Sequence, residues 1–437
     1  MLRIEVPRYP ERIDGLPDKA WVLTNSERGA SACPRRYWFA YIEGLKPKST
    51  SKPLRYGSGW HEVMEAIYRH WMVHDSTCPW SVVSDAIDEV SRQWAQSESD
   101  GQLEFGEAEK ETSRLTNAVL GWVETYGLDP YEDLKIVAVE KAFAAPVRAR
   151  NGKLFRPEMF VVSDGDGGYR PARTGESSIA ETVRWAFYQV GRLDALAVHR
   201  RNGSVWAIDH KSTVSPAQYV RGLSVDPQMQ GYLWMVEQAI ARGFVDGASR
   251  DAKIGGFIYD VASSGKQYDP AVLKNGQISQ SKSKTVPSWR FIQKVSDLSL
   301  DVSDYEEHIA ELRSRIDPKL YQREWMTVSA KGRARYGSEI FGEAKRLAGL
   351  RRSAARIVDP DLIHETHPRV PVCKSAGAFC SFKGPCSEDG ELARLEFNVT
   401  DGMRWLSCDS NKPATDVVLV DPDENTVRGA ERGKLGW

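Results

Sequence analysis

Asp194, Asp209 and Lys211 are the residues of this chain whose types and spacing most clearly suggest chemistry. They lie in residues 191–213, GRLDALAVHRRNGSVWAIDHKST, which predict two β-strands joined at the Asn-Gly pair 202–203. A two-residue turn places Lys211 opposite Asp194, whereas a four-residue loop places Asp209 opposite Asp194. Because these registers differ by two residues, all three charged side chains share one face of the hairpin in either case.

Two carboxylates and an ammonium group on one sheet face are typical of a hydrolytic magnesium or manganese site. Such an ion, held by carboxylate oxygens, stabilises the charge that develops during phosphodiester hydrolysis. We expect Asp194 and Asp209 to bind Mg²⁺ or Mn²⁺, with the backbone carbonyl of His210 as a third ligand and Lys211 positioning the attacking water. The alternative is a surface ion pair of little energetic value, but the apolar residues 205–208 before Asp209 predict a buried strand.

Several flanking elements must position these residues. Residues 56–74 predict a helix that carries His61 one turn from its start, where the histidine is either a metal ligand or an ordinary half-buried side chain. A second helix, over residues 226–243, places Gln228 and Tyr232 on one face at i, i+4 spacing. Residues 135–143, which include Glu140, read as a strand, as do residues 253–262 and 289–296, and residues 21–44 read largely as a helix.

Taken together, these residues resemble the PD-(D/E)XK nuclease superfamily, in particular its RecB-like branch of CRISPR-associated and phage-encoded iron–sulfur exonucleases. The resemblance implies that His61 joins the metal ligands and that Gln228 and Tyr232 lie near the active site. It also implies a second-shell role for Glu140. The positions that match the family motifs are His61, Glu140, Gly191 to Asp194, Asp209 to Lys211, Gln228 and Tyr232.

Six cysteines in 437 residues do not indicate a disulfide scaffold, and four of them suggest a metal centre. Cys33 lies far upstream of Cys373, Cys380 and Cys386, and the resemblance implies that these four hold a 4Fe–4S cluster. Structural Zn²⁺ is the alternative, because His364 and His367 precede the triplet. We expect the remaining cysteines, Cys78 and Cys408, to be buried and unbound.

The resemblance implies an α/β fold: a restriction-endonuclease-like mixed central sheet flanked by helices, with a helical N-terminal elaboration and an iron–sulfur cap. We divide the chain into five parts: an N-terminal extension (1–20), a helical region (21–134), the nuclease core (135–300), a helical region with the cysteine segment (301–410) and a polar, disordered tail (411–437).

The net charge of −1 gives no overall basic signature, so we expect DNA contacts to be local, at Arg35, Arg36, Lys46 and Arg55. The N-terminus does not resemble a signal peptide, and no apolar run approaches bilayer length, which predicts a soluble, cytoplasmic protein without membrane contact. The chain has no P-loop motif, so a helicase or a recombination or CRISPR partner would be a separate chain.

The function predicted from these observations is metal-dependent DNA hydrolysis, exonucleolytic rather than endonucleolytic, at DNA ends or on single strands, in recombination, repair or phage- or CRISPR-related DNA processing. The alternative is a DNA-end-binding or scaffold subunit that keeps the fold and the cluster but does not cut.

Overall fold

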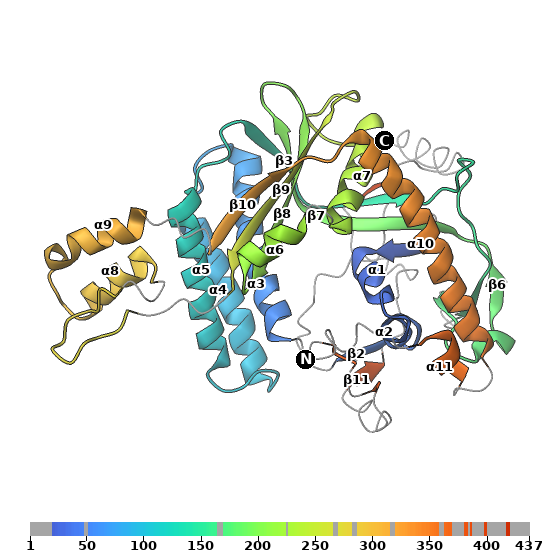
Figure 1. The fold of residues 1–437 in the computed structure, drawn as a ribbon, viewed down its shortest axis with the longest axis horizontal. Helices are drawn as coiled ribbons and strands as arrows, with labels where there is room; N and C mark the ends of the chain where they lie inside the picture. The colour runs from blue at the N-terminus through green and yellow to red at the C-terminus, as the bar shows by residue number, and fades with distance from the viewer. Residues whose placement is uncertain are drawn as a thin grey trace, which may run out of the picture.

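A mixed β-sheet with helices on both faces organises this protein (Figure 1). The structure is a computed structural model. It describes residues 20–47, 51–163, 169–223, 226–264, 270–281, 286–314, 320–357, 362–368, 380–382, 385–386, 397–399 and 417–419. This architecture confirms the predicted α/β fold class.

The central sheet has the strand order β10-β9-β8-β7-β3-β12, and β1 pairs with the first part of β7. Three pairs are parallel (β1 with β7, β8 with β9, and β12 with β3) and the others are antiparallel. The strands are β1 (Ala20–Thr24), β3 (Leu134–Pro146), β7 (Ala186–His199), β8 (Val205–Thr213), β9 (Ile254–Ser263), β10 (Tyr321–Met326) and β12 (Val417–Leu419).

This sheet draws strands from outside residues 135–300, which we assigned to the nuclease core, because β1, β10 and β12 all join it. Within the tail that we predict to be disordered, residues 417–419 form β12 and pair with β3; the rest of the tail lies outside the described residues.

Helices α3 (Lys52–His74), α4 (Trp80–Ser99) and α5 (Glu107–Tyr126) cover one face of the sheet. Helix α7 (Pro227–Ala241) covers the other face, and the long helix α10 (Ala330–Arg356) packs against α7 (Figure 1). The alternation of β8 explains this layering, since Ile208 packs under α3 while Ala207 packs under α7. The short helix α6 (Pro216–Gly222) follows β8.

The N-terminal segment is less continuous than the predicted helix. After β1 it forms α1 (Asn25–Ser31), α2 (Pro34–Tyr37) and a π-helix (Trp38–Ile42). Thr24 caps α1 by accepting the backbone N–H of Glu27 at 3.1 Å. Pro34 then starts a new helix, because a proline ring supplies no backbone N–H and suits a first turn. Strand β2 (Leu45–Pro47) pairs with β11 (Phe397–Val399), and α11 (Ile363–Thr366) lies near α2 (Figure 1).

Two excursions leave the central sheet. Residues 159–183 form a small sheet of β4 (Met159–Ser163), β5 (Tyr169–Pro171) and β6 (Glu181–Val183), with a 3₁₀ turn, η2 (Glu176–Ser178). Between β9 and β10, α8 (Ser288–Asp297), η4 (Val302–Tyr305) and α9 (Glu306–Ser314) form a lobe that projects beyond α5 (Figure 1). The strand predicted over 289–296 is therefore wrong: Phe291 and Val295 lie one helical turn apart in the small core of this lobe.

The hairpin of β7 and β8, which carries Asp194, Asp209 and Lys211, has the four-residue loop and not the two-residue turn. Ala195 pairs with Ile208, and the His199 N–H donates to the Ser204 carbonyl at 2.8 Å. The pairing ends at Ala195 and Ile208, so Asp194 and Asp209 are the next residue of each strand, at the point where β7 and β8 separate. Among the described residues, no helix combines the length and apolar character needed to cross a bilayer.

Candidate metal and catalytic site

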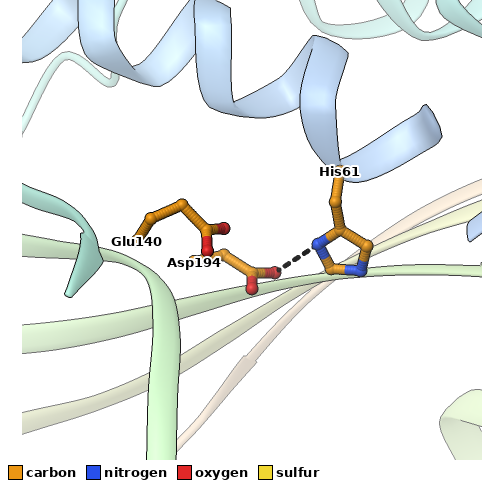
Figure 2. A group of neighbouring side chains, drawn as sticks. All are labelled: His61, Glu140 and Asp194. Carbon is orange, nitrogen blue, oxygen red and sulfur yellow. Dashed lines mark ion pairs between the residues drawn. The ribbon is translucent and has the colours of Figure 1, made fainter. Parts of the chain in front are cut away.

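His61, Glu140 and Asp194 form a group that could hold a metal ion (Figure 2). The three residues come from α3, β3 and β7, and each offers one ligand atom within 4.8 Å of the others. The His61 Nδ1 atom lies 3.2 Å from Asp194 Oδ2. The register of β3 with β7 places Glu140 opposite Asp194, so the two carboxylates meet across neighbouring strands.

The backbone around this group departs from regular strand geometry. Glu140 has φ of +51°, a left-handed conformation that is rare for a residue with a Cβ. Across from it, Leu193 and Leu196 pack into the same core cluster although they are three residues apart, so the alternation of β7 is broken at Asp194. Strained backbone of this kind persists where the surrounding structure holds it, often at functional sites. Here the irregular backbone of β3 and β7 places the Asp194 carboxylate in contact with His61, which lies on α3.

The carboxylate of Asp194 is held in a fixed orientation. Its Oδ2 atom accepts the backbone N–H of His210 at 2.6 Å, which ties β7 to β8 at the end of their pairing. Burial opposes the charge on Asp194, but the nearby His61 and Lys211 outweigh burial and hold the pKa of this carboxyl below its usual value. Burial likewise opposes a charge on His61, and the Asp194 carboxylate outweighs it and raises the pKa of the imidazole.

Glu140 is the carboxyl group of this site whose charged form is disfavoured. Burial, followed by the charges of Asp194 and Glu65, raises the pKa of Glu140 to about 7. Two neighbouring carboxylates such as Glu140 and Asp194 repel one another unless a cation or a proton is present. The donor set of oxygen and imidazole nitrogen therefore fits a divalent ion such as Mn²⁺ or Mg²⁺.

Asp209 and Lys211 form a second, adjacent pair. The Lys211 ammonium group contacts Asp209 Oδ2, and the Asp209 side chain is 3% exposed. Burial, partly offset by Lys211, raises the pKa of Asp209 to about 6. Although burial disfavours the ammonium group, Asp209 and Asp194 outweigh it and raise the pKa of Lys211, so the lysine is charged at neutral pH. Asp209, predicted as a metal ligand, is thus paired with Lys211 here.

A profile of the PD-(D/E)XK nuclease superfamily matches residues 28–386, which contain all of these residues. The chain belongs to the PD-(D/E)XK nuclease superfamily. Its members are metal-dependent nucleases, a class whose substrate is DNA, and this agrees with the ligand group built from His61, Glu140 and Asp194. No curated protein sequence matches this chain.

Helix α7 places Gln228 and Tyr232, the pair predicted to lie near the active site, close to Lys211, the lysine of the PD-(D/E)XK motif. Gln228 Nε2 donates to the Tyr232 hydroxyl at 2.9 Å, and the Tyr232 ring lies close enough to Lys211 to affect its pKa. Asp226 caps α7 by accepting the Gln228 N–H at 2.7 Å and also accepts the Tyr259 hydroxyl at 2.6 Å. Tyr259 lies beside Asp209 in the register of β8 with β9, so Asp226 joins the start of α7 to the catalytic sheet.

The His210 side chain points away from Asp209 and Lys211, toward the layer of α3. It is 2% exposed, and its ring meets that of Tyr68 edge-on with centroids 4.7 Å apart. Burial lowers the pKa of His210 to about 4, so the ring is neutral at the pH of most DNA enzymes. Its predicted role as a metal ligand concerns the backbone carbonyl and remains a prediction.

The predicted DNA-binding residues divide into two sets. Arg35 is 3% exposed and donates from Nε to the His367 carbonyl at 2.8 Å, and Arg55 is 7% exposed and donates to Glu107 at 2.5 Å. Their burial argues against direct phosphate contacts, since Arg35 ties α2 to the segment after α11 and Arg55 ties α3 to α5. Arg36 and Lys46 are exposed, and their contact with DNA remains a prediction.

Three of the four predicted cluster cysteines fall within the described residues. Cys33, Cys380 and Cys386 are half-buried, and the latter two pack against the aromatic core beside the π-helix. In the described part of the chain no three cysteines bring their sulfur atoms within ligand distance of one another, and Cys373 lies outside it. The cluster, its zinc alternative and the iron–sulfur cap therefore remain predictions.

Two features of the site were missed from the sequence. Glu140 was assigned a second-shell role, but its carboxylate lies within 4.8 Å of the ligand atoms of His61 and Asp194 and could itself bind the ion. Tyr259 and Asp226 were not proposed to position α7. The signal for Glu140 was a glutamate that follows four apolar residues in a predicted strand, where a buried carboxylate requires a partner.

Proposed function

We propose that this protein is a metal-dependent deoxyribonuclease that degrades DNA exonucleolytically, from ends or along single strands. One observation carries the proposal: His61, Glu140 and Asp194 converge beside the half-buried, charged Lys211, which pairs with Asp209. A DNA-binding scaffold would have no need to gather two facing carboxylates, a histidine and a lysine, whose burial costs stability unless the groups are used or paired.

His61, Glu140 and Asp194 would hold the divalent ion, which when bound neutralises charge on the phosphate under attack and activates water. The chain's own residues supply the remaining functions. Asp209 keeps Lys211 protonated, so the lysine acts as a hydrogen-bond donor that orients the water or a phosphate oxygen rather than as the base. Gln228 and Tyr232 border the lysine and would contact the DNA backbone.

The finer assignment is to the RecB-like iron–sulfur branch. It is supported by the order of the matching motifs and by the approach of the C-terminal segment to Cys33, where β11 pairs with β2 and Arg35 bonds to His367. Cys33, Cys373, Cys380 and Cys386 would hold a 4Fe–4S cluster, with structural Zn²⁺ as the alternative. By analogy with that branch, we place the protein in the cytoplasm, in recombination, repair or phage- or CRISPR-related processing, beside a helicase or recombination partner.

The test is degradation of end-labelled single- and double-stranded DNA by anaerobically purified protein with Mg²⁺, Mn²⁺ or EDTA. Wild type, Lys211→Ala and Lys274→Ala are compared; Lys274 is exposed in the α8–α9 lobe and serves as the matched control. We expect a metal-dependent ladder from wild type and Lys274→Ala. Lys211→Ala should lose at least about a hundredfold in rate.

A labelled ladder that shortens progressively toward the label, or early release of the label as a mononucleotide, supports an exonuclease, whereas discrete internal products support an endonuclease. If folded wild type with bound metal cuts none of these DNAs but still binds their ends, the non-cutting scaffold becomes the better interpretation.

A further inference from the structure

The hydroxyl group of Tyr336 lies where three elements of the protein meet. Tyr336 is on α10 and is fully buried. Gln189 Nε2 donates to its oxygen at 2.7 Å, and the Arg28 guanidinium group of α1 donates to the same oxygen. Gln189 is also fully buried and lies on β7, five residues before Asp194. This single hydroxyl therefore joins α10 and α1 to the strand that carries a metal-site carboxylate.

The backbone of α7 presses directly on this junction at Gly231. A Cβ atom at position 231 would lie 2.5 Å from the Tyr336 hydroxyl and 2.7 Å from Gln189 Nε2, both closer than real Cβ contacts allow. Only a glycine lets α7 approach so closely, and α7 and α10 lie side by side (Figure 1). The Gln189–Tyr336 pair is thus the surface that sets the depth of α7 at this turn.

The next residue, Tyr232, links the position of α7 to the active site. Its ring lies against Gly191 of the catalytic strand, where an added Cβ would come within 2.4 Å of a ring carbon. Its hydroxyl accepts the Gln228 side chain at 2.9 Å, beside Lys211. A shift of α7 at Gly231 would therefore move the tyrosine and glutamine that border the lysine.

We propose that Tyr336 is a positioning residue of the nuclease reaction, which acts through Gln189 and Gly231 to fix α7 over Lys211. The proposal rests on the proposed nuclease function. Tyr336 touches neither the metal-site residues nor Lys211, so its effect is on the placement of Gln228 and Tyr232. Loss of its hydroxyl leaves the Gln189 amide and the Arg28 guanidinium group without their common acceptor, and the junction must rearrange.

The first test is Tyr336→Phe, which removes one oxygen and keeps the ring. We expect kcat for DNA degradation to fall about 10- to 100-fold with KM nearly unchanged, since a misplacement of catalytic groups by about 1 Å has effects of that size. Tyr305→Phe is the matched control. Tyr305 is 4% exposed and its hydroxyl accepts the Ile278 N–H at 3.2 Å within the α8–α9 lobe, so its loss should leave kcat unchanged.

A double-mutant cycle separates positioning from general destabilisation. If Tyr336 acts through α7, Tyr336→Phe combined with Tyr232→Phe should be scarcely slower than Tyr232→Phe alone. The combination of Tyr305→Phe with Tyr232→Phe should be no slower than Tyr232→Phe. Gln189→Met, which removes the donor at similar volume, examines the same junction from β7 if Tyr336→Phe fails to fold, and it should give the same loss of kcat.

Wild-type kcat in Tyr336→Phe, or rate losses for positions 336 and 232 that multiply, would overturn the positioning role while leaving the nuclease function intact. Wild-type protein that cuts no DNA with either metal would instead overturn the proposed function, and with it this inference.

Discussion

Asp260 lies directly beside His210 in the parallel pairing of β8 and β9, and its fully buried carboxylate is shared by two donors. Trp122 Nε1 donates to it at 3.0 Å and the Arg323 guanidinium group at 2.6 Å. The Arg323 guanidinium group also lies over the ring of Tyr126, 3.9 Å from its centroid. This cluster supports β8 on the face of the sheet that α3 and α5 cover, the same face from which His61 joins the metal site.

We expect Asp260→Ala to lower the free energy of unfolding by about 3–5 kcal/mol, because it leaves the Arg323 charge in a largely buried position without its partner. Urea denaturation measures the change. Asp75→Ala is the control, since Asp75 pairs with Arg200 at the surface, where such pairs contribute about 0–1 kcal/mol. Equal losses for the two variants would contradict the importance of the buried pair.

Gly191→Ala should impair both stability and catalysis. The new methyl group would lie 2.4 Å from the Tyr232 ring, so either β7 or α7 must move, at a cost of about 1–3 kcal/mol. The control is Gly349→Ala in α10, where nothing lies within 4 Å of the added Cβ and helix propensity favours alanine. Thermal unfolding and kcat of the two variants check this; a neutral Gly191→Ala would contradict the described contact.

Metal affinity should increase with pH. Protons compete with the cation for Glu140, whose pKa is about 7, so this carboxyl group is protonated at pH 5 and ionised at pH 8. We expect Mn²⁺ to bind at least about tenfold more tightly at pH 8 than at pH 5.5, as measured by calorimetry. Glu140→Gln should bind more weakly and show a smaller dependence on pH; an unchanged dependence would exclude Glu140 from the site.

The imidazole of His61 should favour Mn²⁺ over Mg²⁺. Nitrogen ligands bind Mn²⁺ more readily than Mg²⁺, which prefers oxygen. Half-maximal activity should therefore require less Mn²⁺ than Mg²⁺, and His61→Asp, which replaces the nitrogen with oxygen, should reduce the difference. Metal titrations of both proteins measure it, and a preference that is unchanged in His61→Asp would show that the histidine is not a ligand.

The prediction that the cysteines hold a 4Fe–4S cluster is tested by the visible absorbance of the purified protein. Cys380→Ser should abolish visible absorbance and lower the melting temperature, because a cluster that joins distant segments contributes to folding. Cys78→Ser is the control, as Cys78 is buried beneath α3 and should leave the absorbance unchanged. Colourless wild type that contains stoichiometric zinc would favour the zinc alternative.

The sequence was sufficient for the fold class and the nuclease superfamily, because these depend on local pattern and motif order, whereas the catalytic roles of Asp194, Asp209 and Lys211 stay predictions. It could not choose the register of the hairpin. The Asn202 side chain accepts the Ser204 N–H at 2.9 Å, and the Gly203 N–H donates to the His199 carbonyl, so the Asn-Gly pair ends a four-residue loop instead of forming a two-residue turn.

Features that depend on distant parts of the chain were beyond the sequence. The ligand position of Glu140 requires a left-handed residue opposite an irregular strand, and neither leaves a mark in composition. Arg35 and Arg55 looked available for DNA because they lie in basic stretches, but His367 and Glu107, both remote in sequence from their partners, engage them. A local charge pattern does not reveal such partners.

The lobe between β9 and β10 has a practical consequence. At its root the Ser263 N–H donates to the Leu320 carbonyl at 2.7 Å, so the two strands already close the sheet without help from the lobe, whose own small core lies outside it. A fluorophore or surface tether attached at the exposed Lys274 would therefore follow the rotation of single molecules on DNA without disturbing the residues that cut it.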